Sequence, residues 1–228
     1  MEKPTRGRRQ IQMQLERQYD LHMSLGSVHR YMSIMNLRSV RKKRYIPQKR
    51  EAQSLPHTFP NVLQQDFHAS DLHNKWLTDI TYLPCRDGIL YLSCIKNLSD
   101  KSIVAYSISN KNDLRLVLDT LQKAEPFMKA GIILHSDRGS QYRSSAYHEY
   151  VQDHGLIMSM SRPGTPYDNA PMESFFSLLK NEELKLHKNR TCVQMRRLIG
   201  RFVSYYNQER PQWGLKKLTP LEFRGQLA

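Results

Sequence analysis

The sequence predicts an α/β fold in which a mixed five-stranded sheet is combined with helices and preceded by a small all-α module. Three features of the sequence support this prediction. Residues 6–36 hold two short helical patterns, residues 74–109 hold three consecutive strand patterns, and helical and strand patterns alternate from residue 112 onward. An antiparallel meander followed by alternating helices and strands is typical of a mixed sheet covered by helices.

Residues 1–37 are predicted to form a helix-turn-helix-like module that binds DNA. The apolar positions of its two patterns repeat at helical spacing: Ile11, Leu15, Val28, Met32 and Met35. The stretch "DLHMSLG" between them predicts a turn, and arginines lie on the polar faces of both helices, as in DNA-binding modules. A helical hairpin that only packs against its neighbour explains the same pattern and remains the alternative.

Positive charge is concentrated near the N-terminus. The formal net charge is +14, and the first 50 residues carry +10 of it, with thirteen Lys or Arg against three acidic residues. This excess favours a polyanionic partner such as nucleic acid, although a solubilising surface or a flexible basic arm is the alternative. Residues 38–59 are basic, contain prolines and lack a sustained period, which predicts a linker. The candidate DNA-contacting residues in the module and the linker are Arg8, Arg9, Arg30, Arg41, Lys42, Lys43 and Arg44.

The sheet is predicted to begin with three strands in direct succession. Their sequences are "KWLTDITYLP", "GILYLSCIKNLS" and "SIVAYSIS", each bounded by Gly, Asn, Asp or Ser. Asp87-Gly88 between the first two strands is a hairpin signal. At this spacing the three strands are expected to form an antiparallel meander.

Helices and strands alternate after the meander. The stretch "NDLRLVLDTLQKAEP" predicts a helix that Asn112 caps and that ends before Pro126. It is followed by the strand "GIILHSD", the helix "SSAYHEYVQDHG" and the strand "LIMSMS". Two further helices are predicted from the period of "APMESFFSLLKNEEL" and "TCVQMRRLIGRFVSYYNQER".

Two aspartates interrupt the strand patterns. Asp137 follows the apolar residues 132–134, so its carboxylate is expected at the C-terminal edge of a buried strand, where open α/β sheets bind ligands. Asp79 lies within the first strand, where a buried acid needs a partner. Each acid has an alternative explanation, because Asp79 can face solvent and Asp137 can form a turn before Arg138-Gly139.

Glu173 lies in the first turn of a predicted helix whose Pro171 favours an early helical position. At about 100° per residue, Glu173 and Lys180 project together beside the apolar stripe of this helix. The stripe consists of Met172, Phe175, Phe176 and Leu179. Carboxylates from separate segments can hold hard cations such as Mg²⁺, and a pair of such ions can promote phosphoryl displacement. For Glu173 the alternative is an acid that satisfies the helix dipole.

The composition disfavours several classes of protein. The three cysteines, Cys85, Cys94 and Cys192, form no C-x-x-C pair, which argues against a disulfide framework and against a structural zinc site. No run of about 18 apolar residues predicts a membrane span, and the basic N-terminus is not followed by the apolar run of a signal peptide. We therefore expect a reducing, cytoplasmic location and no membrane partner.

Three blocks of the sequence belong together: "WLTDITY", "HSDRGSQY" and "DNAPMESFFSLLKNE". They resemble the integrase core of bacterial insertion-sequence transposases of the two-reading-frame type, which are DDE-type enzymes related to retroviral integrases. The 35 residues between Asp137 and Glu173 match the spacing of that family's D,D-35-E triad, and Lys180 matches the basic residue seven positions after its glutamate. The tail "YYNQERPQWGLKKLTPLEF" and the helix-turn-helix pattern of residues 8–44 are similar to that family as well.

The resemblance implies an RNase H-like core in residues 60–187, extended by C-terminal helices in residues 188–228. It places Asp79 on the first strand, Asp137 after the fourth strand and Glu173 on a following helix. These three would be the catalytic residues and would bind Mg²⁺, for which Mn²⁺ can substitute. Lys180 would contact DNA phosphate.

The activity implied by the resemblance is Mg²⁺-dependent 3′-end cleavage and strand transfer of a mobile element. The alternatives are a catalytically silent DNA-binding regulator of transposition and a structure-selective nuclease on the same fold. Element ends and target DNA are the implied partners, bound by a homo-oligomer at the nucleoid of a bacterial cytoplasm. An upstream reading frame usually supplies a further helix-turn-helix and a leucine zipper. We see neither in this sequence, so an upstream-frame protein is a further expected partner.

Overall fold

The computed structural model describes residues 7–37, 57–68, 75–184 and 189–227. Most of the expected linker therefore lies outside the described residues. Four of the expected DNA-contacting residues also lie outside them: Arg41, Lys42, Lys43 and Arg44.

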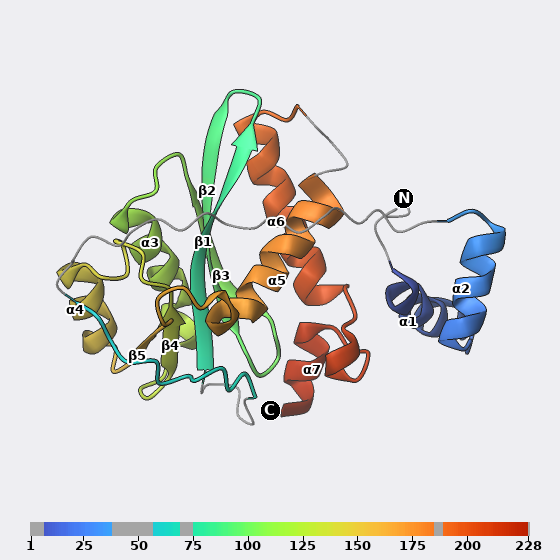
Figure 1. The fold of residues 1–228 in the computed structure, drawn as a ribbon, viewed down its shortest axis with the longest axis horizontal. Coiled ribbons are helices and arrows are strands. Elements are labelled where there is room, and N and C mark those ends of the chain that lie inside the picture. The colour runs from blue at the N-terminus through green and yellow to red at the C-terminus, as the bar shows by residue number, and fades with distance from the viewer. Residues whose placement is uncertain (1–6, 38–56, 69–74, 185–188, 228) are drawn as a thin grey trace.

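A mixed sheet of five strands forms the core of the protein (Figure 1). Its strands are β1 (Lys75–Cys85), β2 (Gly88–Asn97), β3 (Ile103–Ser109), β4 (Ile133–Ser136) and β5 (Ile157–Met160). They lie in the order β3-β2-β1-β4-β5. The first three strands pair antiparallel, whereas β4 pairs parallel with both β1 and β5. The mixed sheet predicted from the strand patterns is confirmed.

Helices cover both faces of this sheet (Figure 1). The helices after β3 are α3 (Leu114–Ala124), α4 (Ser145–Asp153), α5 (Ala170–Leu179), α6 (Cys192–Gln208) and α7 (Pro220–Leu227). α3 and α4 pack around a buried cluster that contains Trp76 of β1, and α5 and α6 pack around a second cluster that contains Leu77. Trp76 and Leu77 are neighbours that point to opposite faces, as the period of two in a strand requires. Among the described helices, none is long and apolar enough to cross a membrane.

The apolar stripe predicted for α5 is confirmed. Its members are all buried: Met172, Phe175, Phe176 and Leu179. Phe175 packs edge-on against Tyr206 of α6, with ring centroids 4.9 Å apart. Each such side chain contributes roughly 1.5–3 kcal/mol by its burial, so the stripe fixes which flank of α5 faces away from the core.

The predicted cap of α3 is wrong by one residue. Asp113, and not Asn112, caps the helix, because its carboxylate accepts a hydrogen bond from the backbone N–H of Leu116 at 3.1 Å. Asn112 instead accepts a hydrogen bond from Gln141 Nε2 at 2.9 Å. Asn and Asp are about equally good caps, so the local sequence could not decide between them.

The N-terminal module consists of two helices, α1 (Arg8–Tyr19) and α2 (Leu25–Ile34), which match the two helical patterns. Met13 of α1 and Val28 and Met32 of α2 are buried. Met35 does not belong to this buried stripe, contrary to the prediction. α2 ends at Ile34, so the Met35 side chain lies beyond the last turn and is 60% exposed.

Polar groups join the module to the C-terminal part of the chain. Arg17 of α1 donates a hydrogen bond to the carbonyl of Lys217 at 2.9 Å and forms an ion pair with Glu222 at 2.6 Å. The ammonium group of Lys217 in turn pairs with Glu16 of α1. Because these side chains are partly exposed, solvent screens both ion pairs and weakens them.

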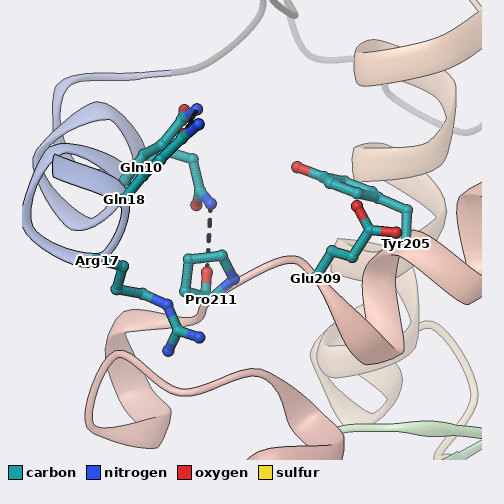
Figure 2. Close-up of a pocket in the computed structure, with 7 residues that line it drawn as sticks. Gln10, Arg17, Gln18, Tyr205, Glu209 and Pro211 are labelled. Carbon is teal, nitrogen blue, oxygen red and sulfur yellow. Dashed lines mark hydrogen bonds between the residues drawn. The ribbon is translucent and has the colours of Figure 1, made fainter.

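A pocket of about 310 Å³ lies between α1 and the end of α6 (Figure 2). It is lined by Gln10, Gln14, Arg17, Gln18, Tyr205, Glu209 and Pro211. Figure 2 shows the side chain of Gln10 reaching from α1 to the carbonyl of Pro211, at 3.4 Å. None of the three predicted catalytic acids lines this pocket, so it belongs to the junction of the module and not to the candidate active site.

Candidate active site

Asp79 lies on β1, and Asp137 directly follows β4, the parallel strand beside β1. Leu77 of β1 pairs with His135 of β4. Asp79 and Asp137 each lie two residues beyond this last pair, and the charge of Asp137 acts on the Asp79 carboxyl. Adjacent strands are about 4.8 Å apart, and residues two positions apart share a face. Asp79 therefore lies on the face of Leu77, which α5 covers.

The sheet opens where these two acids lie. β4 ends at Ser136, whereas β1 continues to Cys85. The paired part of β1 on this side ends at Leu77. Asp79 is half-buried at the start of the opening, and Asp137 is exposed. Of the two acids, Asp137 is the one that reaches solvent at the carboxyl end of β4.

The local backbone orients both carboxylates. Asp79 Oδ1 accepts a hydrogen bond from the N–H of Ile80 at 2.7 Å, and Asp137 Oδ1 accepts one from the N–H of Gly139 at 2.8 Å. A Cβ atom at position 139 would lie 3.0 Å from Asp137 Oδ1 and 3.2 Å from Gln141 Oε1. Gly139 is therefore needed for the carboxylate of Asp137 to lie this close to the backbone.

Glu173 is brought to the same place by α5. It is exposed in the first turn of the helix, beside the buried stripe. The start of α5 is fixed by Lys96, a buried lysine of β2 whose Nζ donates to the carbonyl of Pro171 at 3.0 Å. Lys96 was not singled out from the sequence, because a lysine in a strand pattern gives no sign of its burial or of a partner 75 residues away.

The three acids influence one another electrostatically. Burial raises the pKa of Asp79 well above its usual range, and the negative charge of Asp137 and then that of Glu173 raise it further. Partial burial of the carboxyl groups also raises the pKa values of Asp137 and Glu173, although other atoms of both residues reach solvent. Carboxylates with raised pKa values bind a cation favourably, because the cation removes the repulsion between them.

Lys180 lies at the end of α5, on the same side as the acids. Its Nζ donates a hydrogen bond to Thr81 Oγ1 at 2.6 Å and lies 5.2 Å from the ring centroid of Tyr82. Thr81 shares a face of β1 with Asp79, and the positive charge of Lys180 partly opposes the rise in the pKa of Asp79. A cationic side chain is thus held next to the acidic group.

The donor set of this group suits Mg²⁺, which prefers carboxylate oxygens. Within the described residues, the ligand atoms of three acidic, histidine or cysteine side chains lie within 4.8 Å of one another only at Cys85, Asp87 and Cys192. The three acids are therefore spread more widely than that. Two Mg²⁺ ions about 3.5–4 Å apart, each about 2 Å from its ligands, separate oxygens on opposite ions by up to about 8 Å, so a shared pair of ions accommodates this spread.

A further carboxylate, that of Asp168, holds the chain that leads into α5. It is fully buried and accepts hydrogen bonds from Arg162 Nη2 at 3.0 Å, Asn61 Nδ2 at 2.9 Å and Gln65 Nε2 at 2.6 Å. The hydrogen bonds from Arg162 hold the pKa of Asp168 well below its usual range. This junction ties the loop before Glu173 to residues 61–65, and the sequence patterns did not predict it.

His135 forms another buried junction, two residues before Asp137. Ser159 Oγ accepts hydrogen bonds from the backbone N–H groups of Val62 and Leu63, so its own proton is donated to His135 Nδ1 at 2.8 Å. Nε2 then carries the ring proton and donates it to Ser161 at 3.0 Å. Burial lowers the pKa of His135 to about 4, so the ring is neutral near pH 7 and joins β4 to β5 beside the candidate site.

The expected DNA-contacting arginines of the N-terminal module are far from the three acids in the sequence. Two of them are exposed to solvent, and the third lies against an aromatic ring. Arg8 and Arg30 are exposed. The guanidinium group of Arg9 lies 5.9 Å from the ring centroid of Trp213, on the opposite side of the junction with the C-terminal segment. Arg9 therefore also supports the docking of α1.

Comparisons with known proteins agree with the fold. Two family models, both described as Integrase core domain, match residues 71–166 and 154–220, and an HTH-like domain family matches residues 1–45. The putative transposase InsK for insertion sequence element IS150 of Escherichia coli K12 is 34% identical over 225 residues, which are 96% of this chain and 77% of that relative. The chain belongs to the insertion-sequence transposases with an integrase core domain.

Other similarities support the assignment to this family. The transposase InsF for insertion sequence IS3fB of E. coli K12 is 35% identical over 193 residues, 83% of this chain and 67% of that relative. In structure, the catalytic core domain of HTLV-2 integrase, solved in complex with magnesium, has a TM-score of 0.53 at 14% identity and covers 67% of this chain and 96% of its own. At this identity the likeness concerns the fold, and it confirms the predicted RNase H-like integrase core.

Proposed function

We propose that this transposase cleaves the 3′ ends of a mobile DNA element and joins each freed 3′-hydroxyl to another phosphodiester. The observation that carries the proposal is the parallel pairing of β1 and β4, beyond whose last pair Asp79 and Asp137 each follow by two residues at the carboxyl end of β4. The influence of Glu173 on the pKa of Asp79 supports a third acid at the same place. A site made of three carboxylates and one lysine is suited to phosphoryl transfer on a polyanion.

Asp79, Asp137 and Glu173 would hold Mg²⁺, or Mn²⁺ in its place. When bound, the cations supply the positive charge that activates an attacking oxygen and stabilises the leaving one. The protein's own contribution is geometric. The N–H groups of Ile80 and Gly139 orient two carboxylates, and the anchored start of α5 orients the third.

Contacts to DNA phosphates would position the substrate. Lys180 is held next to the acids and would contact the phosphate that reacts. The remaining contacts are proposed to come from the module and the linker: Arg8, Arg9, Arg30, Arg41, Lys42, Lys43 and Arg44. Phosphate contacts place the DNA without reading its sequence, so recognition of the element ends requires further groups.

The reaction joins two element ends to one target, so we propose a homo-oligomer on DNA, in the cytoplasm at the nucleoid. An upstream-frame protein is proposed as a further partner. Domain limits at residues 37, 59 and 187 also stay predictions. The assembly on DNA, the partner protein and the domain limits can each be tested independently of the chemistry of the three acids.

The decisive experiment compares wild type, Asp137→Asn and Asp153→Asn on labelled element-end DNA with Mg²⁺. Asp153 is an exposed acid at the end of α4 and serves as the matched control. Asp137→Asn should lose both cleavage and joining while binding DNA like wild type, and Asp153→Asn should retain both reactions. The reactions are run with and without the upstream-frame protein.

The same experiment separates the other candidate functions. Hydrolysis without joined product in the wild type would indicate a structure-selective nuclease. DNA binding without either product, under all conditions, would indicate a regulatory DNA-binding protein. Full activity of Asp137→Asn would contradict the proposed role of the three acids.

A further inference from the structure

The turn between β1 and β2 meets the start of α6. Cys85 is the last residue of β1, Asp87 lies in the turn, and Cys192 is the first residue of α6. Two hydrogen bonds hold these segments together. Cys192 N–H donates to Asp87 Oδ1 at 2.7 Å, and Arg86 N–H donates to the carbonyl of Arg190 at 2.8 Å. The side chains of the turn and of the helix start are therefore fixed relative to each other.

We propose that Cys85, Asp87 and Cys192 form a second metal site, which binds a thiophilic divalent cation such as Zn²⁺. One ligand atom from each side chain lies within 4.8 Å of the other two. In a tetrahedral zinc site with Zn–S bonds of about 2.3 Å, two sulfurs lie about 3.8 Å apart. The three side chains therefore need to move by only about 1 Å to surround the ion.

The ligand chemistry separates this site from the three acids. Two thiolates and one carboxylate select Zn²⁺ over Mg²⁺, because thiolates are soft ligands and Mg²⁺ requires oxygen. Binding releases the two thiol protons to solvent. The resulting centre has a net charge of −1. Arg86 lies between Cys85 and Asp87 in the chain, and Arg190 lies two residues before Cys192. The fourth position of a tetrahedral zinc is left for water or an external ligand.

The surroundings suit a site that stabilises the fold. Cys85 and Cys192 are half-buried and pack against the hydrophobic cluster under α5 and α6, whereas Asp87 is exposed and leaves a path for the ion. A cation here would fasten the far end of β1 to α6. β1 also carries Asp79, but zinc binding does not depend on strand transfer, so either proposal can fail without the other.

Cobalt is a suitable probe, because thiolate ligation of Co²⁺ gives an absorption band in the near ultraviolet. Reduced protein without an affinity tag is titrated with Co²⁺ in excess Mg²⁺. The wild type should show the thiolate band, saturate at one equivalent and lose the band when Zn²⁺ is added. Cys85→Ser and Cys192→Ser should each weaken binding by more than about a hundredfold, and Asp87→Asn by at least about tenfold.

Cys94→Ala is the matched control, because Cys94 is fully buried in the core and lies outside the group. It should keep the band. A measurement on wild type alone avoids any loss of folding in the variants: Zn²⁺, but not Mg²⁺, should protect Cys85 and Cys192 from alkylation. The proposal is overturned if reduced wild type gives no thiolate band, if both serine variants keep it, or if Zn²⁺ leaves the alkylation rates unchanged. The same holds if the two cysteines form a disulfide in air and bind no metal after reduction.

Discussion

Asp168 and Asp79 are two acids close to α5 whose surroundings act in opposite directions. Asp168 accepts hydrogen bonds from three side chains, those of Arg162, Asn61 and Gln65. The bonds from Arg162 hold its pKa well below the usual range. Asp79 instead lies near two other acids, and burial together with the charge of Asp137 holds its pKa well above that range.

The difference separates a structural acid from a candidate functional one. The charge of Asp168 is satisfied within the protein, so it adds to the stability of the fold. The charge of Asp79 opposes those of its neighbours, so ionisation of the group costs stability until a cation or a proton relieves the repulsion. Groups of like charge at an accessible edge are characteristic of sites that bind an ion or a substrate.

The largest expected effect is on strand transfer. Asp79→Asn should lower the rate of joining by at least about a thousandfold, because loss of a ligand for the cations removes several kcal/mol of transition-state stabilisation, at 1.36 kcal/mol per factor of ten. Asp168→Asn should lower it by only about ten- to a hundredfold, as for residues that orient ligands indirectly. Single-turnover assays of joined DNA measure both, and similar losses in the two variants would remove the distinction between the acids.

The next largest expected effect is on the free energy of unfolding, and here Asp168→Asn should have a larger effect than Asp79→Asn. Asp168→Asn should lower the free energy of unfolding by about 2–3 kcal/mol, because three side-chain donors lose their charged acceptor at a buried position. This loss of stability should be smaller than that for a fully buried ion pair, because the side chain of Arg162 is 58% exposed. Asp79→Asn should not lower the free energy of unfolding in EDTA. Urea denaturation measures both variants, and a destabilised Asp79→Asn would show that Asp79 has a structural role.

The sequence predicts the candidate functional acids, but it does not predict the structural role of Asp168. Asp79 and Asp137 are visible because they interrupt apolar strand patterns, and the helical period places Glu173 and Lys180 together on α5. The fold follows from the same local periods. The role of Asp168 cannot be predicted from local patterns, because its hydrogen-bond donors Asn61 and Gln65 lie 107 and 103 residues away in the chain.

The cysteines illustrate the same limit. Cys192 bonds to Asp87 across 105 residues, so a search for closely spaced cysteines could not find their group. Even a local feature was missed where two residues are chemically equivalent, as with Asn112 and Asp113 at the start of α3. Period and spacing therefore predict elements and their edges, whereas pairs between distant polar side chains require the folded chain.

Thermal stability in EDTA should depend on pH with opposite signs at the two acids. Between the ordinary pKa of 3.8 and the raised pKa of Asp79, the folded chain binds more protons than the unfolded chain, so the contribution of Asp79 to stability falls as the pH rises through this window. The contribution of Asp168 is present above pH 3.8 and is lost as the pH falls below it. Asp79→Asn should therefore have a higher Tm than wild type at pH 7, and Asp168→Asn a lower one.

Melting curves from pH 7 down to pH 4 test these signs. The advantage of Asp79→Asn should disappear toward pH 4, whereas the deficit of Asp168→Asn should persist through that range. Mg²⁺ at pH 7 should raise the Tm of wild type by mass action and leave that of Asp79→Asn nearly unchanged. A Tm difference between wild type and Asp79→Asn that does not vary with pH would mean that repulsion among the acids is not the cause.

The smallest expected effect concerns Lys180, the cation held beside the acids. Lys180→Ala should weaken DNA binding a few-fold and reduce the slope of log K against log salt concentration by about 1, because one phosphate contact is lost. Lys129→Ala is the control, since this exposed lysine lies before β4, at the end of the strand opposite Asp137. It should leave the slope unchanged if it makes no phosphate contact. If Lys180→Ala and wild type have equal slopes, Lys180 has a structural role like that of Asp168 and supports the fold through Thr81 and Tyr82. If the slope falls only in Lys180→Ala, Lys180 contacts DNA and belongs to the candidate active site with the three acids.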